Sequence, residues 1–166
     1  RQKNLRGELV VLGQEGAINS LATHPKKHCI VISGASGHIH LWDYQLKKVV
    51  KITELASLSV SAMAFDAKGE YLVVGCTNGV VKILDGEQIE ELQHFRPSHA
   101  AILDIKFSHD SLFIAYSDSD NAVGILKWDH RDQNAAKEVE WIYLGRFKSH
   151  KKPISGLEFG MVPFGD

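Results

Sequence analysis

Apolar residues along the chain occur in short runs of about five to seven positions, separated by turn-forming residues. The runs are rich in β-branched residues, and Pro25, Gly37 and Tyr44 lie between the first ones. Runs of this length and composition predict antiparallel strands joined by hairpins. No segment longer than about ten residues has a helical period. We therefore predict an all-β fold, with the first four strands at residues 17–23, 28–33, 37–42 and 48–52.

This pattern repeats along the chain. One apolar motif begins at Ile18, Val60, Ile102 and Ile154, so the first two steps are 42 residues each and the last is 52. The ten additional residues of the last step have an obvious place in the polar stretch 129–138. Two further landmarks keep the period. The apolar triplet at 30–32 recurs at 72–74 and 114–116, and the Trp-Asp pair at 42–43 recurs as Leu-Asp at 84–85 and, slightly displaced, as Trp-Asp at 128–129.

Four-stranded units of 40–45 residues that close with Trp-Asp are typical of WD-repeat β-propeller blades. The chain resembles this family over essentially its whole length, although Leu84-Asp85 departs from the closing pair. The Gly-His that opens many repeats survives only as Gly-Gln at 13–14 and Ser-His at 98–99 and 149–150. Because a ring of seven blades at this period needs roughly 300 residues, the resemblance implies a partial ring of about three to four blades. The expected divisions are a last strand of a preceding blade at 1–12, repeats at 13–55, 56–97 and 98–148 with an insert at 129–138, and the start of a fourth repeat at 149–166.

The third repeat contains four residues that match the polar network found inside WD-repeat blades. The resemblance implies that Asp120 accepts a hydrogen bond from His99, that His99 reaches Ser117, and that Ser117 meets the indole N–H of Trp128. The same Ser, His and Asp could suggest a nucleophilic triad. However, Ser117 is expected in a buried strand without the sharp Gly-x-Ser-x-Gly turn that exposes a nucleophile. We therefore expect these residues to stabilise the blade.

No pattern of residues predicts an enzyme, a cofactor or a metal site. His38 and His40 lie two apart on one expected strand and so share a face, but no third ligand follows at a diagnostic spacing. The carboxylate pairs at 90–91 and 118/120 look like ordinary turn charges, and the chain has no glycine-rich phosphate loop. Cys29 and Cys76 lie in apolar runs and are expected to be buried free thiols.

Two surface segments are candidates for binding a partner. Lys148, Lys151 and Lys152 form a short basic loop that could bind an acidic partner such as a tubulin tail or a calmodulin-like surface; a merely solvated loop is the alternative. The insert at 129–138 extends beyond the regular blade, where loops on a rigid scaffold often determine specificity. It also starts a Trp-Asp-x-Arg pattern ending at Arg131, which resembles the substrate receptors of cullin-type ubiquitin ligases.

The stretch 141–160, together with 115–120, is similar to a group of WD-repeat proteins of cilia and flagella at the base of axonemal radial spokes, within a calmodulin- and spoke-associated complex. This resemblance implies a structural component of the axoneme that supports motility. Its partners would be other spoke-complex subunits, calmodulin or doublet microtubules. A receptor of a ubiquitin ligase remains the alternative function.

The bulk composition agrees with a protein-binding module. A formal net charge of −1 over 166 residues argues against nucleic acid as the main partner, since phosphate binding usually requires a basic stripe. The longest apolar runs, such as 29–32 and 71–74, are far shorter than the ~20 residues that cross a bilayer. We therefore expect a non-enzymatic scaffold in the cytoplasm, within the cilium or flagellum, that binds proteins and neither nucleic acid nor membrane.

Overall fold

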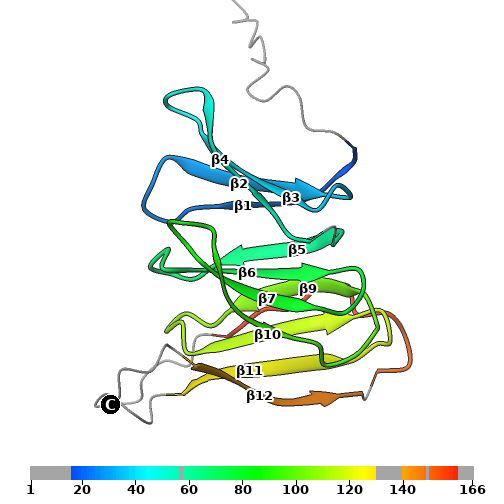
Figure 1. Cartoon of the computed structure of the whole chain (residues 1–166). Helices are drawn as coiled ribbons and strands as arrows, with labels where there is room; N and C mark the ends of the chain where they lie inside the picture. The colour runs from blue at the N-terminus through cyan, green and yellow to red at the C-terminus, as the bar shows by residue number, and fades with distance from the viewer. Residues whose placement is uncertain (1–15, 57, 130–139, 149, 161–166) are drawn as a thin grey trace, which may run out of the picture.

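The computed structural model of the chain describes residues 16–56, 58–129, 140–148 and 150–160. These residues form three four-stranded antiparallel sheets that lie side by side, and no helix occurs among them (Figure 1). Within each sheet the strands are paired in sequence order. The all-β fold and the blade architecture expected from the repeat are confirmed. The predicted strand at the N-terminal end of the chain lies outside the described residues.

Each sheet corresponds to one period of the sequence. The first blade contains β1 (Ile18–Thr23), β2 (Cys29–Gly34), β3 (His38–Asp43) and β4 (Lys48–Glu54). The second contains β5 (Val60–Phe65), β6 (Tyr71–Cys76), β7 (Val81–Asp85) and β8 (Glu91–Phe95). The third contains β9 (Ile102–Phe107), β10 (Phe113–Asp118), β11 (Val123–Asp129) and β12 (Glu140–Phe147). The four strands predicted for the first blade agree with the observed ones to within two residues at each end.

The blades stack through their first strands, β1 beside β5 and β5 beside β9. Each of these strands has a β-bulge near its start, at Asn19, Ser61 and Leu103. A bulge leaves one residue outside the ladder and changes the direction of its side chain. Asn19 Nδ2 donates to the carbonyl oxygen of Val60 at 3.2 Å, and Ser61 Oγ donates to that of Ile102 at 2.6 Å. The bulges at Asn19 and Ser61 thus supply polar contacts between the inner strands of neighbouring blades.

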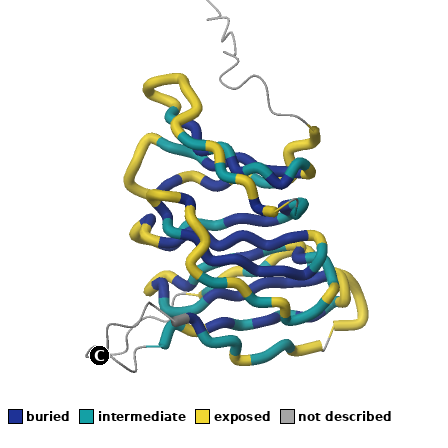
Figure 2. Tube along the Cα trace, viewed as in Figure 1, coloured by how far each residue is buried: buried dark blue, intermediate teal, exposed yellow. Residues whose placement is uncertain are grey.

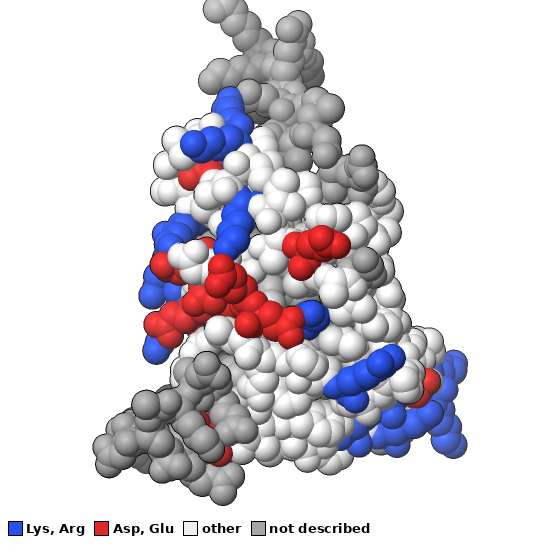
Figure 3. Space-filling view, in the orientation of Figure 1, with Lys and Arg blue, Asp and Glu red and all other residues white. Residues whose placement is uncertain are grey.

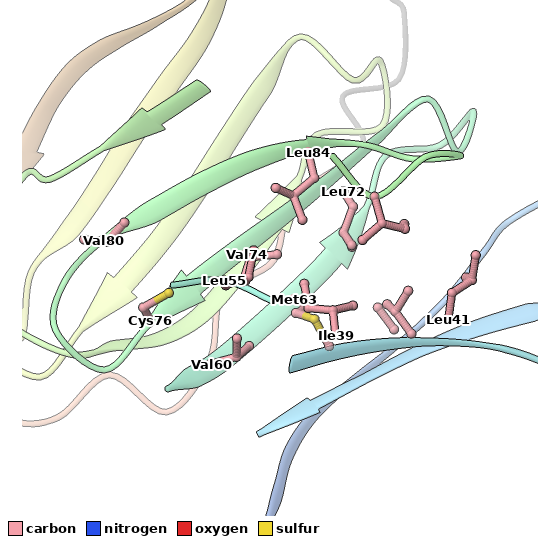
Figure 4. Packing of buried hydrophobic residues seen from close by; sticks show 13 residues of the cluster. Ile39, Leu41, Leu55, Val60, Met63, Leu72, Val74, Cys76, Val80 and Leu84 are labelled. Atoms are coloured by element: carbon pink, nitrogen blue, oxygen red, sulfur yellow. The ribbon is translucent and has the colours of Figure 1, made fainter. Parts of the chain in front are cut away.

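Two apolar clusters fill the space between neighbouring blades, and the buried residues lie along the middle of the strands (Figure 2). In the cluster between the first two blades, which includes Leu41, the side chain of Ile39 lies against Met63 of the second blade (Figure 4). The cluster between the second and third blades includes Ile83, Ile102 and the indole of Trp141. Because each sheet buries a face against its neighbour, the blades stabilise one another.

The turns repeat as regularly as the strands. Gly37, Gly79 and Asn121, each 42 residues from the next, have φ values of 74°, 83° and 62° and close the second hairpin of their blades. Glycine and asparagine tolerate this left-handed conformation better than other residues. In the third hairpin, Asp43 Oδ1 accepts hydrogen bonds from two turn amides at 2.8 and 2.9 Å, and Asp85 Oδ1 accepts the equivalent pair at 2.8 and 2.6 Å. The repeated Asp is therefore a turn cap.

Residues 154–160 lie beyond the third blade and form no sheet of their own. Their backbone returns to the start of β9, where the amide of Leu157 donates to Asp104 Oδ2 at 3.0 Å. This contact lies where the first two blades use a bulge donor, a role that Leu103 cannot fill because its side chain has no polar atom. A side-chain acceptor at Asp104 here replaces the side-chain donors Asn19 and Ser61.

Both cysteines are free thiols. Cys76 is buried at the end of β6, as predicted, and burial raises the pKa of its thiol to about 11. Cys29 is only half-buried, which differs from the expectation. Cys29 is the first residue of β2, beside the turn that follows β1, and the sheet is partly exposed to solvent at this end.

Candidate protein-interaction site

The two ends of the strands form two different surfaces. The turns after the first and third strands of each blade meet at one end, which we call the hairpin face. The turn after the second strand and the segment that links one blade to the next meet at the other end, which we call the connecting face. In Figure 1 the hairpin face lies to the left and the connecting face to the right. Loops on such ends of a rigid scaffold are available to bind partners.

On the hairpin face, a groove of about 390 Å³ lies where the first and second blades meet. Beside it, Lys27 forms an ion pair with Glu87, and Lys51 of β4 forms one with Glu90 at 3.3 Å. Lysines and carboxylates alternate around this groove, so it presents no single sign of charge. The lining residues are His24, Lys26, Lys27, Lys68, Gly69, Glu70, Asp85 and Glu87.

The buried base of this groove contains His24, whose Nδ1 accepts hydrogen bonds from the amides of Lys26 and Lys27 at 3.1 and 3.0 Å. Burial and the charge of Lys27 lower the pKa of the imidazole. Asp66 and Ser108 occupy the same position in the next two blades, and each also accepts amide hydrogen bonds in its turn. His24 is thus an acceptor that closes a turn.

The predicted polar network of the third blade does not form, which corrects the expectation drawn from the family resemblance. Ser117 is fully buried, and its Oγ has no hydrogen-bond partner among the described residues. His99 is exposed, and its Nδ1 lies 3.1 Å from Arg96 Nη2. Asp120 pairs with Arg146 at 2.9 Å and not with His99.

Strand register explains this difference. Ser117 is opposite Val123, whereas Trp128 lies five residues further along β11. At about 3.3 Å per residue, the hydroxyl and the indole are near opposite ends of the hairpin. Trp128 instead packs edge-on against Tyr71 of the second blade, with ring centroids 5.2 Å apart. Its role is to fill the space between blades.

A charged cluster that sequence reasoning missed lies on the connecting face. Arg146 in β12 donates from Nε to Asp118 Oδ2 at 2.6 Å and from Nη2 to Asp120 Oδ2 at 2.9 Å. Asp118 is fully buried, and these two carboxylates raise the pKa of the guanidinium. A signal was present in the sequence, because Arg146 is the only cation in a mainly apolar strand and the turn at 118–120 is rich in Asp. Finding it required the pairing of β11 with β12, which places Arg146 opposite Gly124.

The basic loop predicted at the end of the third blade is exposed. Lys148, Lys151 and Lys152 all point to solvent, as expected for a loop that can bind a partner. Arg131 and nearly all of the insert at 129–138 lie outside the described residues, and only Asp129 ends a described strand. His38 and His40 lie on β3, and no group of three His, Cys, Asp or Glu able to hold a metal occurs within the described ranges. The same ranges contain no helix long and apolar enough to cross a bilayer.

Comparison with known proteins supports the β-propeller fold and identifies relatives of the chain. The model of the Vps8 β-propeller family matches residues 14–131. A protein of Pongo abelii named cilia- and flagella-associated protein 251 is 30% identical over 158 residues, which make up 93% of this chain and 13% of that protein. The protein of the same name from Chlamydomonas reinhardtii is 24% identical over 163 residues, 96% of this chain and 19% of that protein.

A second group of relatives carries a different name. Echinoderm microtubule-associated protein-like 2 of Mus musculus is 26% identical over 151 residues, which are 91% of this chain and 22% of that protein. The chain thus spans between about a tenth and a quarter of the length of the relatives it matches.

Proposed function

Because the chain belongs to the Vps8 β-propeller family, we propose that it is a non-enzymatic scaffold of cilia and flagella, where its blades bind other proteins of the axoneme. The observation that carries this proposal is the similarity along 93% of the chain to a protein named for cilia and flagella. The protein of the same name from Chlamydomonas reinhardtii is similar along 96% of the chain, which supports the same assignment.

The structure suits a scaffold for physical reasons. Stacked blades hold their turns rigidly, because every described strand is paired and the apolar clusters lock each sheet to the next. A rigid surface loses little conformational entropy when a partner binds. Binding energy would come from a few side chains on the hairpin face, the connecting face or the outer strands.

Within the axoneme, we place the protein at the base of the radial spokes. This finer assignment is supported by the similarity of residues 141–160 to WD-repeat proteins of that region. The expected partners are subunits of the spoke complex, calmodulin and doublet microtubules. The relatives named for microtubule association make the microtubule the first partner to test.

The proposal is tested by tagging the full-length protein in a ciliated cell. After the membrane is removed with detergent, the protein should remain with the axoneme, and averaged tomograms of axonemes lacking it should miss density at the spoke base. Beating should become weak or uncoordinated in the same cells. A protein that washes out with the detergent fraction and leaves the spokes intact when deleted would contradict the proposal.

A further inference from the structure

The charges of the molecule are distributed unequally between its two end faces. On the connecting face, Arg96, Lys148, Lys151 and Lys152 are exposed, and we call these four residues the basic rim. The hairpin face of the second blade instead carries Glu70, Asp85, Glu87 and Glu90. Figure 3 shows acidic side chains gathered toward the left of the middle blade, with basic side chains beside them, and a second group of mainly basic side chains at the lower right.

Hydrogen bonds join the segments that carry the basic rim into one surface. The amide of Ala101 donates to Ser119 Oγ at 3.0 Å, and the amide of Ser119 donates to the carbonyl oxygen of Ala101 at 2.9 Å. The linking segment after Arg96 is therefore fastened to the turn at 118–122. Arg146 fastens the end of β12, just before Lys148, to the same turn.

The cations of the basic rim are uncompensated. Asp118 and Asp120, the carboxylates of the adjoining turn, are both engaged by Arg146. None of the four rim cations forms an ion pair within the part of the chain that the structure describes. On the hairpin face, by contrast, Glu87 and Glu90 are paired with lysines of the first blade. Positive charge is thus available on one face, whereas the negative charge of the other is partly neutralised.

We propose that the basic rim binds an extended acidic polypeptide, with glutamate-rich tails of tubulin as its source in the axoneme. The identification of tubulin rests on the proposed function, whereas the acidic chemistry rests on the charges alone. Lysines on a loop match a flexible acidic chain, because each ammonium can follow a carboxylate without a fixed geometry. The hairpin face carries lysines and carboxylates side by side, so an acidic chain would be attracted more strongly to the connecting face.

The test uses the full-length protein and a fluorescent peptide of ten glutamates, with ten glutamines as the neutral control. Binding is measured by anisotropy for the wild type and for the triple variant Lys148→Glu, Lys151→Glu, Lys152→Glu. The matched variant Lys26→Glu, Lys48→Glu, Lys68→Glu makes the same change of charge at exposed positions of the hairpin face. We expect the rim variant to bind roughly tenfold more weakly or worse, since three surface ion pairs are removed and repulsion is added. The matched variant should change the affinity by less than about twofold.

Two results would overturn the inference. Equal weakening by both triple variants would mean that only net charge matters, and unchanged binding by the rim variant would mean that the glutamates bind elsewhere. Hydrogen exchange of β9–β12 in each variant establishes that the blade remains folded. The outcome is independent of the ciliary proposal. If the protein stays with the axoneme but the rim variant binds the peptide normally, the inference alone is wrong. If peptide binding depends on the rim but the protein is absent from axonemes, the proposed function alone is wrong.

Discussion

Asn19 and Ser61, one repeat of 42 residues apart, occupy the same bulge and make the same hydrogen bond to the next blade. In each case the acceptor is the carbonyl oxygen of the first residue in the neighbouring inner strand. The side chains differ in chemistry, an amide in one blade and a hydroxyl in the other. The two blades therefore share a side-chain hydrogen-bond donor at the bulged residue, whose side chain the bulge directs away from its own sheet.

Removal of this donor should loosen the junction between the second and third blades. Ser61→Ala removes the hydroxyl that bridges the carbonyl oxygens of Gly75 and Ile102. We expect the opening free energy of amides in β5 and β9 to fall by about 1 kcal/mol, because a net intramolecular hydrogen bond contributes that amount. Native-state hydrogen exchange of the full-length protein measures the change strand by strand.

Ser155 provides the control, because it occupies the equivalent position one repeat beyond Leu103 but is exposed. Ser155→Ala should leave protection of the inner strands unchanged. Equal protection in Ser61→Ala and the wild type would show that the inter-blade bond contributes nothing.

Gly75 in β6 should not tolerate a larger residue. A Cβ at this position would lie 2.4 Å from Ile102 Cγ2 and 2.8 Å from Ile102 Cβ of the next blade. The branched Ile102 side chain cannot move without disturbing the packing of the second cluster, so Gly75→Ala should destabilise the blades by about 1–3 kcal/mol. The denaturation midpoint of the full-length protein, followed by the fluorescence of its buried tryptophans, measures the effect.

Gly160→Ala is the matched substitution, since a Cβ there has nothing within 4 Å. Its midpoint should equal that of the wild type. In an Ile102→Ala background, Gly75→Ala should cost less than in the wild type, because the clashing side chain is gone. An equal cost in both backgrounds would show that the clash is not the cause.

The period and the strand pattern could be predicted from the sequence because both depend on local properties. Apolar alternation and turn residues such as Gly37 and Gly79 act within a single hairpin. The network predicted around Ser117 is wrong because the register of β10 and β11 places Ser117 opposite Val123 and so separates it from Trp128 along the hairpin.

Contacts between blades could not be predicted in this way. The bulges at Asn19 and Ser61 depend on how two sheets fit together, and no residue type marks them in the sequence. The pairing of Arg146 with Asp118 requires knowledge of the last hairpin, whose connection contains the insert at 129–138. The exposed lysines at 148, 151 and 152 were predictable because a charged loop rarely becomes buried.

Gln93 should hold the outer strands of the second and third blades together. Its side-chain amide donates to the carbonyl oxygen of Trp141 at 2.9 Å and accepts from the amide of Trp141 at 2.8 Å. Because Trp141 is only 2% exposed, water cannot easily replace these bonds. Gln93→Ala should lower protection of the Trp141 amide by about 1–3 kcal/mol.

The control for this substitution is Gln88→Ala, which changes an exposed glutamine in the turn before β8. We expect no change in the exchange of β12 in that variant. If Gln93→Ala lowers the hydrogen-exchange protection of β8 but not that of β12, Gln93 does not hold the two outer strands together.

The two cysteines should react at different rates with an alkylating reagent. Burial raises the pKa of Cys76 to about 11, so about one thiol in a thousand is ionised at pH 8. The pKa of Cys29 is also raised by burial, but this thiol is only half-buried. Mass spectrometry of tryptic peptides after iodoacetamide treatment should find Cys29 modified first, and modification of Cys76 should require opening of the blade. Faster modification of Cys76 in the native protein would contradict this order.

The two carboxylates that bind Arg146 should contribute unequally to stability. Asp118 has no exposed surface and also accepts hydrogen bonds from the amides of Asp120 and Ala122 at 2.9 and 3.2 Å. Asp118→Ala leaves the Nε of Arg146 and two turn amides without their acceptor, and should cost about 3 kcal/mol. The side chain of Asp120 is 54% exposed, so Asp120→Ala should cost less than about 1 kcal/mol.

Thermal or urea unfolding of the two variants, with hydrogen exchange of the turn at 118–122, measures this difference. The double variant Asp118→Ala, Arg146→Ala tests its cause. If the loss arises mostly because the Nε of Arg146 has no partner, removing Arg146 as well should restore part of the stability. Similar costs for Asp118→Ala and Asp120→Ala would instead mean that the turn, and not the buried ion pair, holds this corner of the third blade and positions the lysines that follow β12.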